Sequence, residues 1–318
     1  MTGTETAARR GGAPSGGRAT AERVLAGADV AVAAQLACLI EASAPKPGNV
    51  SPGRHFADAR YEDFLASAAA IGEPMAAAGA RPVGATVRRA IEASSRWTRS
   101  NTNLGIVLLF TPLARAALRA VALPDQPLTL REAVGQVLAE TTVDDAREVY
   151  AAIRLASPGG LGRAEAQDVS GEPDATLVEV MRLAAHRDAV AREYASSFEV
   201  TFETGAPALE QARRDGLSWD DAVVETFLSV LAATPDTHVA RRAGEAAAGE
   251  VSEHARRALA AGGVRSAAGW RAIDEMDRAL RDARNIRNPG TTADLTAATI
   301  FVVLLRGEWK GGSHAGSG

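Results

Sequence analysis

Hydrophobic residues along this chain recur with the 3.6-residue period of amphipathic helices. In the segment 219–233, Val223, Phe227 and Leu231 follow one another at four-residue spacing. Ser218 precedes the segment and Asp221 stands three residues later, a spacing that resembles a helix capping box. The segment therefore predicts a helix that buries one face. The same pattern predicts helices at 20–43, 61–78, 83–98, 104–121, 130–140, 144–156, 176–194, 206–214, 219–233, 237–261, 266–285 and 293–305.

Strand patterns are weak by comparison. Residues 198–202 come nearest to an alternating segment, but five residues are too few to found a sheet. We therefore expect an all-α fold, with a single multi-helix bundle domain over residues 19–306 and an active site built from its loops. The Gly-, Ala- and Arg-rich residues 1–18 predict a disordered tail, and residues 307–318 predict a flexible one.

Composition agrees with helices and narrows the function. Apolar residues make up 46% of the chain and aromatic residues only 4%, so small side chains that suit close helix packing prevail. A net charge of −4, from 35 Lys and Arg against 39 Asp and Glu, argues against nucleic-acid and membrane-surface binding. The single cysteine, Cys38, lies in an apolar run and is expected to be a buried, inert thiol. With no apolar stretch of about 18 residues and no recognisable signal peptide, we expect a cytoplasmic protein.

Interruptions between the helices are where chemistry is expected. The first, residues 45–58, combines prolines that stiffen the backbone with glycines that let a ligand approach it closely. Lys46 and Arg54 could hold phosphate, and Asp58 could bind a metal or a sugar hydroxyl. A rigid surface connection with solvated charges explains the same residues, so both interpretations stay open.

Two further interruptions open helices with polar residues. Asn101, Thr102 and Asn103 precede the apolar helix 104–121, and three residues of this type exceed what one N-cap requires. Thr292 and Asp294 stand where the last helix begins, where they can cap it and complement its dipole. Helix N-termini also bind anions, so both places could hold phosphate, and Asp294 could reach a magnesium ion.

Two more carboxylates attract attention. Asp188 falls on the apolar stripe of the predicted helix 176–194, where a carboxylate is costly unless it is paired or used. A buried pair with Arg187 or Arg192 and a catalytic or metal-binding acid both remain open. Asp236 either caps the helix that follows it or contributes to a shared cleft.

Several common chemistries lack their residues. The chain has no pair of histidines at H-x-x-x-H spacing, no cysteine ligand set and no G-x-S-x-G element. Structural zinc and covalent Ser or Cys catalysis are therefore disfavoured. The remaining carboxylates, amides, hydroxyls and cations suit a sugar and a magnesium-bound phosphate.

A family resemblance rests on these same segments. Residues 41–48 (Glu-Ala-Ser-Ala-Pro-Lys-Pro-Gly), Asn101-Thr102, Asp236-Thr237 and residues 288–294 (Asn-Pro-Gly-Thr-Thr-Ala-Asp) resemble the triphosphoribosyl-dephospho-CoA synthase family. The matches keep their order between about residue 33 and residue 305. Where the family pattern has Asn-Thr-His-Lys-Gly, this chain has Asn101-Thr102-Asn103-Leu104-Gly105. The first loop also departs, with Asn49-Val50-Ser51 after the glycine and a wider His55-x-x-Asp58 element.

The resemblance implies an all-α enzyme that uses ATP as a sugar donor. An acceptor hydroxyl attacks C1 of the ATP ribose, adenine leaves, and the triphosphate stays on the transferred ribosyl group. We expect Asp188, Asp236 and Asp294 to serve as catalytic base or Mg²⁺ ligands, without assigning which does which. Lys46 and Arg54 are expected at the triphosphate. The other expected substrate-binding residues are Asn49, Ser51, His55, Asp58, Asn101, Thr102, Asn103, Thr237, Asn288, Gly290 and Thr292.

Three functions remain open on the sequence. The first is transfer of the triphosphoribosyl group to dephospho-CoA or to a different small-molecule acceptor. The second is hydrolysis of a nucleotide or ADP-ribosyl N-glycosidic bond, and the third is ATP binding without catalysis. The expected partners are ATP and the acceptor, without nucleic acid or membrane, and a homodimer is compatible with the sequence.

Overall fold

The computed structural model describes residues 25–122, 128–159, 162–282, 284–307 and 309. The all-α expectation is confirmed: this part of the chain contains helices and no β-strand, only an isolated bridge between Ser51 and Arg54. The expected tail at 1–18, and all but two residues of the one at 307–318, lie outside the described residues. The helices are α1 (Gly27–Ser43), α2 (Tyr61–Ala70), α3 (Gly72–Ala76), α4 (Val83–Ser95), α5 (Leu104–Ala122), α6 (Leu130–Ala139), α7 (Val143–Ala156), α8 (Leu177–Ala184), α9 (Ala189–Ser196), α10 (Ala206–Arg214), α11 (Trp219–Ala233), α12 (Thr237–Ala243), α13 (Glu245–Ala260), α14 (Ala267–Leu280) and α15 (Gly290–Leu305), with a π-helical turn at Val200–Gly205 and a 3₁₀ turn at Gly263–Arg265.

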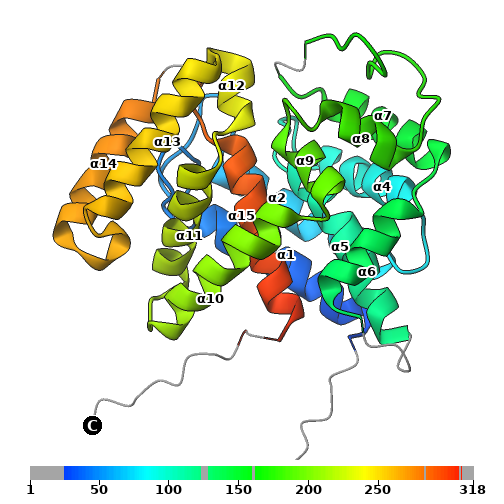
Figure 1. Cartoon of the computed structure of the whole chain (residues 1–318), viewed down its shortest axis with the longest axis horizontal. Helices are drawn as coiled ribbons and strands as arrows, with labels where there is room; N and C mark the ends of the chain where they lie inside the picture. Colours follow the sequence, from blue (N-terminus) through cyan, green and yellow to red (C-terminus); the bar gives the residue numbers. More distant parts are fainter. Residues whose placement is uncertain (1–24, 123–127, 160–161, 283, 308, 310–318) are drawn as a thin grey trace, which may run out of the picture.

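Helix α15 forms the centre of the molecule. It packs on α1, α5 and α11, and every side chain from Leu295 to Leu305 is buried. Phe301 stacks on Phe110 of α5 with ring centroids 4.4 Å apart. Figure 1 shows α10 to α14 on one side of α15 and α2 to α9 on the other. The N-terminal end of α15 is therefore enclosed by segments that are distant in sequence.

Three of the predicted helices are interrupted. The predicted helix 61–78 breaks at Ile71, because Pro74 has no N–H to continue the hydrogen bonding. The predicted helix 237–261 breaks at Gly244, whose φ of +91° suits glycine.

The predicted helix at 219–233 is confirmed, and Ser218 Oγ accepts from Asp221 N at 3.1 Å.

The third interruption corrects the placement of Asp188. Helix α8 ends at Ala184 and α9 begins at Ala189, so Asp188 is an N-cap whose Oδ1 accepts from Ala191 N at 3.1 Å. The expectation that Asp188 faces the core from the middle of one helix was wrong, because Asx side chains favour caps over helix interiors. Its ion-pair partner is Arg241 of α12, at 2.7 Å, rather than Arg187 or Arg192.

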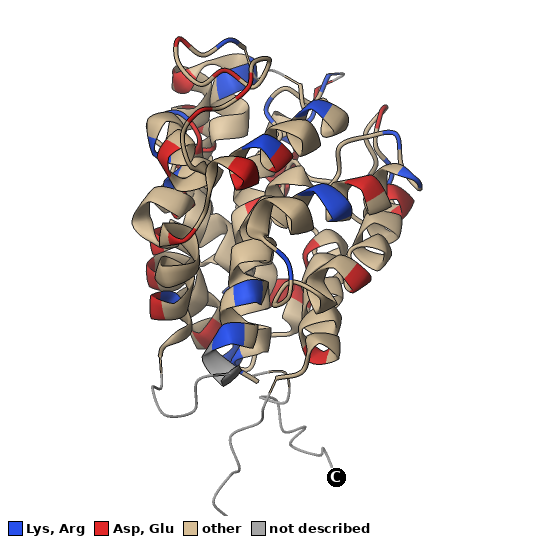
Figure 2. Ribbon diagram, turned by 90° about the vertical axis from the view of Figure 1, so that its right-hand side faces the viewer, with Lys and Arg blue, Asp and Glu red and all other residues tan. Residues whose placement is uncertain are grey.

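Figure 2 shows Lys and Arg interspersed with Asp and Glu on the side it presents, as the nearly balanced composition led us to expect. Within the described ranges, no helix combines the length and the apolar character that crossing a bilayer requires.

Candidate active site

Asp294 lies one turn into α15, and its half-buried carboxylate rests against the first turn of α5. A methyl group built on Gly105 would come within 2.1 Å of Asp294 Oδ2. The carboxylate thus fills space that only a glycine at position 105 leaves open. Among the described residues, no hydrogen bond or ion pair engages Asp294. A carboxylate held in place without a partner is available to a ligand.

Other carboxylates surround Asp294. Burial raises its pKa well above the usual value, and the negative charges of Glu41, Asp236 and Asp188 raise it further, while Arg241 opposes them. Four acidic side chains and one guanidinium, from four separate segments of the chain, therefore act together at the start of α15. At neutral pH, Asp294 holds its proton more tightly than an ordinary aspartate.

Asp236 joins two helix N-termini. Its Oδ1 accepts from Val239 N at 2.9 Å and caps α12. Its Oδ2 accepts from both the N–H and the Oγ1 of Thr292, each at 2.7 Å, in the first turn of α15. Burial raises the pKa of Asp236, and these hydrogen bonds lower it. Both oxygens are thus engaged, and Asp236 holds the site together.

Thr237 extends the junction that Asp236 forms. Its Oγ1 accepts from Ala189 N at 3.1 Å and donates to Thr291 Oγ1 at 3.3 Å, linking α9, α12 and α15. Asn288 and Gly290 precede the buried turn of α15, and Gly290 lies beside the His238 ring. The structure therefore brings together the following residues of the predicted site: Asp188, Asp236, Thr237, Asn288, Gly290, Thr292 and Asp294.

Glu41 is a member of the site that the sequence reasoning missed. It lies on α1, buried, and its Oε1 is 3.0 Å from Lys46 Nζ. The argument that drew attention to Asp188 applies to Glu41, because it follows the buried Cys38 and Ala34 at helical spacing. Burial and the charges of Glu41 and Asp294 raise the pKa of Cys38, which is buried as expected.

Lys46 is itself buried, with 1% of its surface exposed. Its ammonium donates to the carbonyl oxygens of Glu41 and Ala44 and pairs with the Glu41 carboxylate. These three acceptors match the three protons of an ammonium group. In this structure Lys46 therefore orients Glu41 rather than presenting a free charge.

The rest of the first loop is fastened to α14. Asp277 Oδ1 accepts from Gly48 N at 2.8 Å, and Asp277 Oδ2 pairs with Arg54 Nη1 at 3.3 Å. Asn49 and Ser51 are buried, and the Asn49 carbonyl oxygen accepts from Arg281 Nη2 at 2.7 Å. Arg54 remains 41% exposed in its side chain.

His55 and Asp58 lie on the exposed end of this loop. His55 Nδ1 accepts from Tyr61 N at 3.2 Å at the start of α2, and the Asp58 carbonyl oxygen accepts from Ser100 Oγ. The carbonyl contact brings the first loop to the second, but no contact places either side chain at Asp294.

The second loop is largely occupied by local contacts. Asn101 Oδ1 accepts from Leu104 N at 3.1 Å and caps α5. Thr102 and Ser67 share a hydrogen bond, and Asn103 Nδ2 donates to Ser94 Oγ at 2.9 Å. The loop reaches the site through its last residue, Gly105, under the Asp294 carboxylate.

Arg241 is the second residue that the sequence reasoning missed. Its Nη1 donates to Asp188 Oδ2 at 2.7 Å, and its charge lowers the pKa of both Asp236 and Asp294. No local sequence pattern indicates that Arg241 belongs to the site, because its partner Asp188 lies 53 positions earlier. Burial, with Arg241 and Arg242, lowers the pKa of His238 to about 4, so His238 is neutral at pH 7.

No ready-made metal centre is present in the described part of the chain. There, no three His, Cys, Asp or Glu side chains are grouped closely enough to hold an ion by themselves. A divalent ion at this site would need oxygens from a ligand such as a phosphate.

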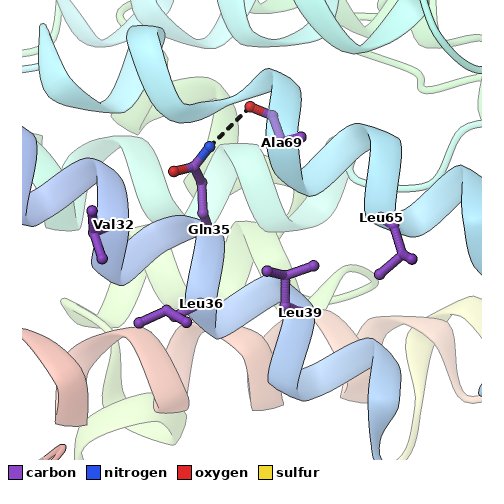
Figure 3. Close-up of a pocket in the computed structure, with 6 residues that line it drawn as sticks. All are labelled: Val32, Gln35, Leu36, Leu39, Leu65 and Ala69. Carbon is purple, nitrogen blue, oxygen red and sulfur yellow. Dashed lines mark hydrogen bonds between the residues drawn. The ribbon is translucent and has the colours of Figure 1, made fainter.

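A hollow in the described part of the chain lies away from these residues. It has a volume of about 260 Å³ and is lined by α1 and α2 (Figure 3). Leu36, Leu39 and Leu65 face it, and Gln35 uses its amide to donate to Ala69 O at 3.0 Å. With neither a cation nor a carboxylate in its lining, it suits no phosphorylated ligand.

Comparison with known proteins agrees with the fold and the motifs. The model of the family described as ATP:dephospho-CoA triphosphoribosyl transferase matches residues 27–313. The chain belongs to this family, and the resemblance seen in the sequence is confirmed. The 2-(5''-triphosphoribosyl)-3'-dephosphocoenzyme-A synthase of Pectobacterium atrosepticum is 30% identical over 246 residues, which cover 77% of this chain and 70% of that protein.

Two further relatives are informative. The "Probable 2-(5''-triphosphoribosyl)-3'-dephosphocoenzyme-A synthase" of Pseudomonas paraeruginosa is 39% identical over 110 residues, or 34% of this chain. This match spans only 37% of that relative's length. The crystal structure of a "putative triphosphoribosyl-dephospho-coA synthase" from Archaeoglobus fulgidus has 29% identity and a TM-score of 0.59, covering 77% of this chain and 99% of that one.

Gly105→Ala tests the contact beneath Asp294. The new methyl group would displace the carboxylate, and a displacement of about 1 Å can cost about 10²-fold in rate. The backbone itself should tolerate alanine, which favours helices over glycine by about 1 kcal/mol. We expect a loss of kcat in an adenine-release assay with little loss of thermal stability. The control is Gly249→Ala on α13, where an added methyl group meets nothing within 4 Å. Unchanged kcat in Gly105→Ala would contradict a role for this contact.

Proposed function

We propose that this protein transfers the 5-triphosphoribosyl group of ATP to a hydroxyl of dephospho-CoA, with release of adenine. Family membership supports the reaction, and the observation that carries it is the unpartnered Asp294 carboxylate among other acidic side chains. Breaking the bond between C1 of the ribose and the adenine nitrogen builds positive charge on the sugar. The negative field of Glu41, Asp188 and Asp236 would stabilise that charge.

The proton balance of the reaction suits Asp294. The acceptor hydroxyl loses a proton as its oxygen bonds to C1, and the departing adenine gains one on nitrogen. We assign Asp294 the second task, because burial and neighbouring carboxylates raise its pKa, so it holds a proton more readily than an ordinary aspartate and can deliver it to a leaving group.

A divalent ion, for which we propose Mg²⁺, would enter with the triphosphate. Since the described carboxylates form no closed metal site, the phosphate oxygens would supply most of its ligands. Asp188 is our candidate for the protein ligand, because its side chain is 28% exposed whereas Asp236 is buried. Arg54, whose side chain is partly exposed, is the candidate cation for the triphosphate.

The remaining sequence expectations stay predictions. Asn49, Ser51, Thr102 and Asn103 are buried and would shape the loops, whereas His55, Asp58 and Asn101 are exposed and could still meet a substrate. Placement in the cytoplasm and a homodimer are also predictions, and the molar mass in solution tests the latter.

Product analysis tests the proposed reaction. Protein incubated with ATP, Mg²⁺ and dephospho-CoA should release free adenine and add a triphosphoribosyl mass to the acceptor. Release of only ADP, AMP or phosphate by folded protein would overturn the proposal. Adenine release that is independent of any acceptor would identify the hydrolase instead. Adenine release only with another acceptor would retain the chemistry and replace dephospho-CoA.

A further inference from the structure

Unsatisfied polar atoms single out one edge of the site. In the described residues, four side-chain atoms are buried without a hydrogen-bond partner, and two of them are Arg241 Nε and Asn288 Oδ1. Buried polar atoms are rarely left unpaired, because each costs about 1–3 kcal/mol. Arg241 pairs with Asp188, and Asn288 directly precedes the first turn of α15, so a donor and an acceptor left open on these two segments point to a ligand that completes both.

His238 lies near Asn288 and on the same helix as Arg241. A methyl group built on Gly290 would lie 3.4 Å from the His238 ring and 3.7 Å from Asn288 Nδ2, so Asn288 and His238 border the same turn. Arg241 follows His238 by three residues on α12, and such residues share a helix face. The Arg241 guanidinium cannot turn freely, since its Nη1 is held by Asp188 Oδ2 at 2.7 Å.

The pairing of one donor with one acceptor restricts the ligand. A phosphate oxygen would accept from Arg241 but would repel the Asn288 carbonyl oxygen. An amino group would donate to Asn288 and leave Arg241 unpaired. Hydroxyl groups can do both, and a ribose carries two of them on adjacent carbons.

We propose that Arg241 Nε and Asn288 Oδ1 bind the 2′- and 3′-hydroxyls of the donor ribose. Arg241 donates to one hydroxyl oxygen, and the other hydroxyl donates to Asn288. This subsite rests on the proposed function, because it assumes a ribose donor. It places the ribose near the start of α15, because Asp236, which caps the helix that carries Arg241, binds Thr292 two residues before Asp294. Arg241 acts here on binding and orientation, and Asp294 acts on the reacting atoms.

The test removes one protein partner by substitution and one ribose hydroxyl by use of a deoxynucleotide, separately and together. Wild-type protein, Asn288→Ala and Arg241→Lys are each compared for kcat/KM with ATP, 2′-deoxyATP and 3′-deoxyATP. Arg241→Lys keeps a cation for Asp188 but removes the Nε donor. The wild type should discriminate against each deoxynucleotide by about 10-fold or more. Each variant should lose this discrimination at one hydroxyl, because the partner of that hydroxyl is already gone.

The intrinsic lability of a deoxyribose cancels in this comparison, since it affects every variant equally. The control is Arg242→Lys, a neighbouring exposed arginine that donates to the carbonyl oxygens of Arg284 and Asn285. If the losses from variant and deoxynucleotide simply multiply, the ribose subsite is wrong even though the transferase reaction stands.

Equilibrium binding measurements test the ribose subsite independently of the proposed transferase reaction. Calorimetric Kd values for ATP and 2′- and 3′-deoxyATP should show the same coupling without any turnover. Coupled binding without adenine release would support the ribose subsite and overturn the proposed reaction. Equal Kd values for all three nucleotides would overturn the subsite.

Discussion

Replacing Asp294 with Asn should lower the kcat for adenine release by about 10²–10⁴-fold, the range that a positioned proton donor contributes. Asparagine keeps the shape of the side chain over Gly105 but cannot deliver the proton that adenine needs. The matched control is Asp274→Asn, an exposed carboxylate on α14, for which kcat should stay unchanged. Full activity of Asp294→Asn would remove Asp294 from the mechanism.

The same substitution should not destabilise the fold, and this separates a catalytic role from a structural one. The folded-state pKa of Asp294 is raised above the unfolded value of about 3.9, so the folded protein binds more protons between those two values. Its unfolding free energy therefore falls as the pH rises through that interval. Asparagine does not titrate, so Asp294→Asn should lose this fall and have an equal or higher Tm at neutral pH. A lower Tm at neutral pH would contradict this assignment.

The fold was predictable because long amphipathic helices leave a clear 3.6-residue period of apolar residues in the sequence. Trp219–Ala233 carries its own cap and apolar face, and the structure agrees with both. The boundaries that failed were set by single residues that the periodicity ignores, such as Pro74 within a regular apolar pattern and Gly244 with its positive φ. The prediction for Asp188 was wrong for the same reason, because the helical period of apolar residues continues across the break at which Asp188 caps α9.

The site was partly predictable for a different reason. Asp236 was visible in the sequence as a cap residue, and it caps α12 while also accepting from Thr292 in the first turn of α15. Thr292 was expected to cap α15, but that helix begins earlier, at Gly290, and the Thr292 hydroxyl donates to Asp236 instead. Arg241 was not visible, because its importance arises only when α12 packs beside Asp188. Sequence spacing can place a residue on a helix, but it cannot say which distant charge the residue will meet.

Lys46 gives the second large prediction, because loss of its charge would leave Glu41 buried without a partner. Breaking a buried ion pair costs about 3–5 kcal/mol, so Lys46→Met should lower the unfolding free energy by that amount in a denaturant titration. Arg88→Met on α4 is the control. Arg88 pairs with Glu92 and Glu148 on the surface, where such pairs contribute about 0–1 kcal/mol.

Two more variants show whether the ammonium is needed for its shape or only for its charge. The chain has two lysines, Lys46 and Lys310, among 35 basic residues, so lysine at position 46 stands out against a general preference for arginine. Lys46→Arg keeps the charge, but a planar guanidinium does not match the compact set of acceptors around the ammonium. We therefore expect Lys46→Arg to be destabilised as well. Glu41→Gln combined with Lys46→Met should recover part of the loss, because no buried charge is left unpaired.

The alternative role of Lys46, direct contact with the triphosphate, predicts a different pattern. Lys46→Met would then raise the KM for ATP while the unfolding free energy stayed near that of the wild type. Lys46→Arg would keep most of the affinity, since a guanidinium also binds phosphate. The position of the ammonium, 1% exposed and with its protons directed at Glu41 and Ala44, favours loss of stability as the dominant effect. Any loss of activity should then appear in kcat, through the displacement of Glu41 from the field around Asp294.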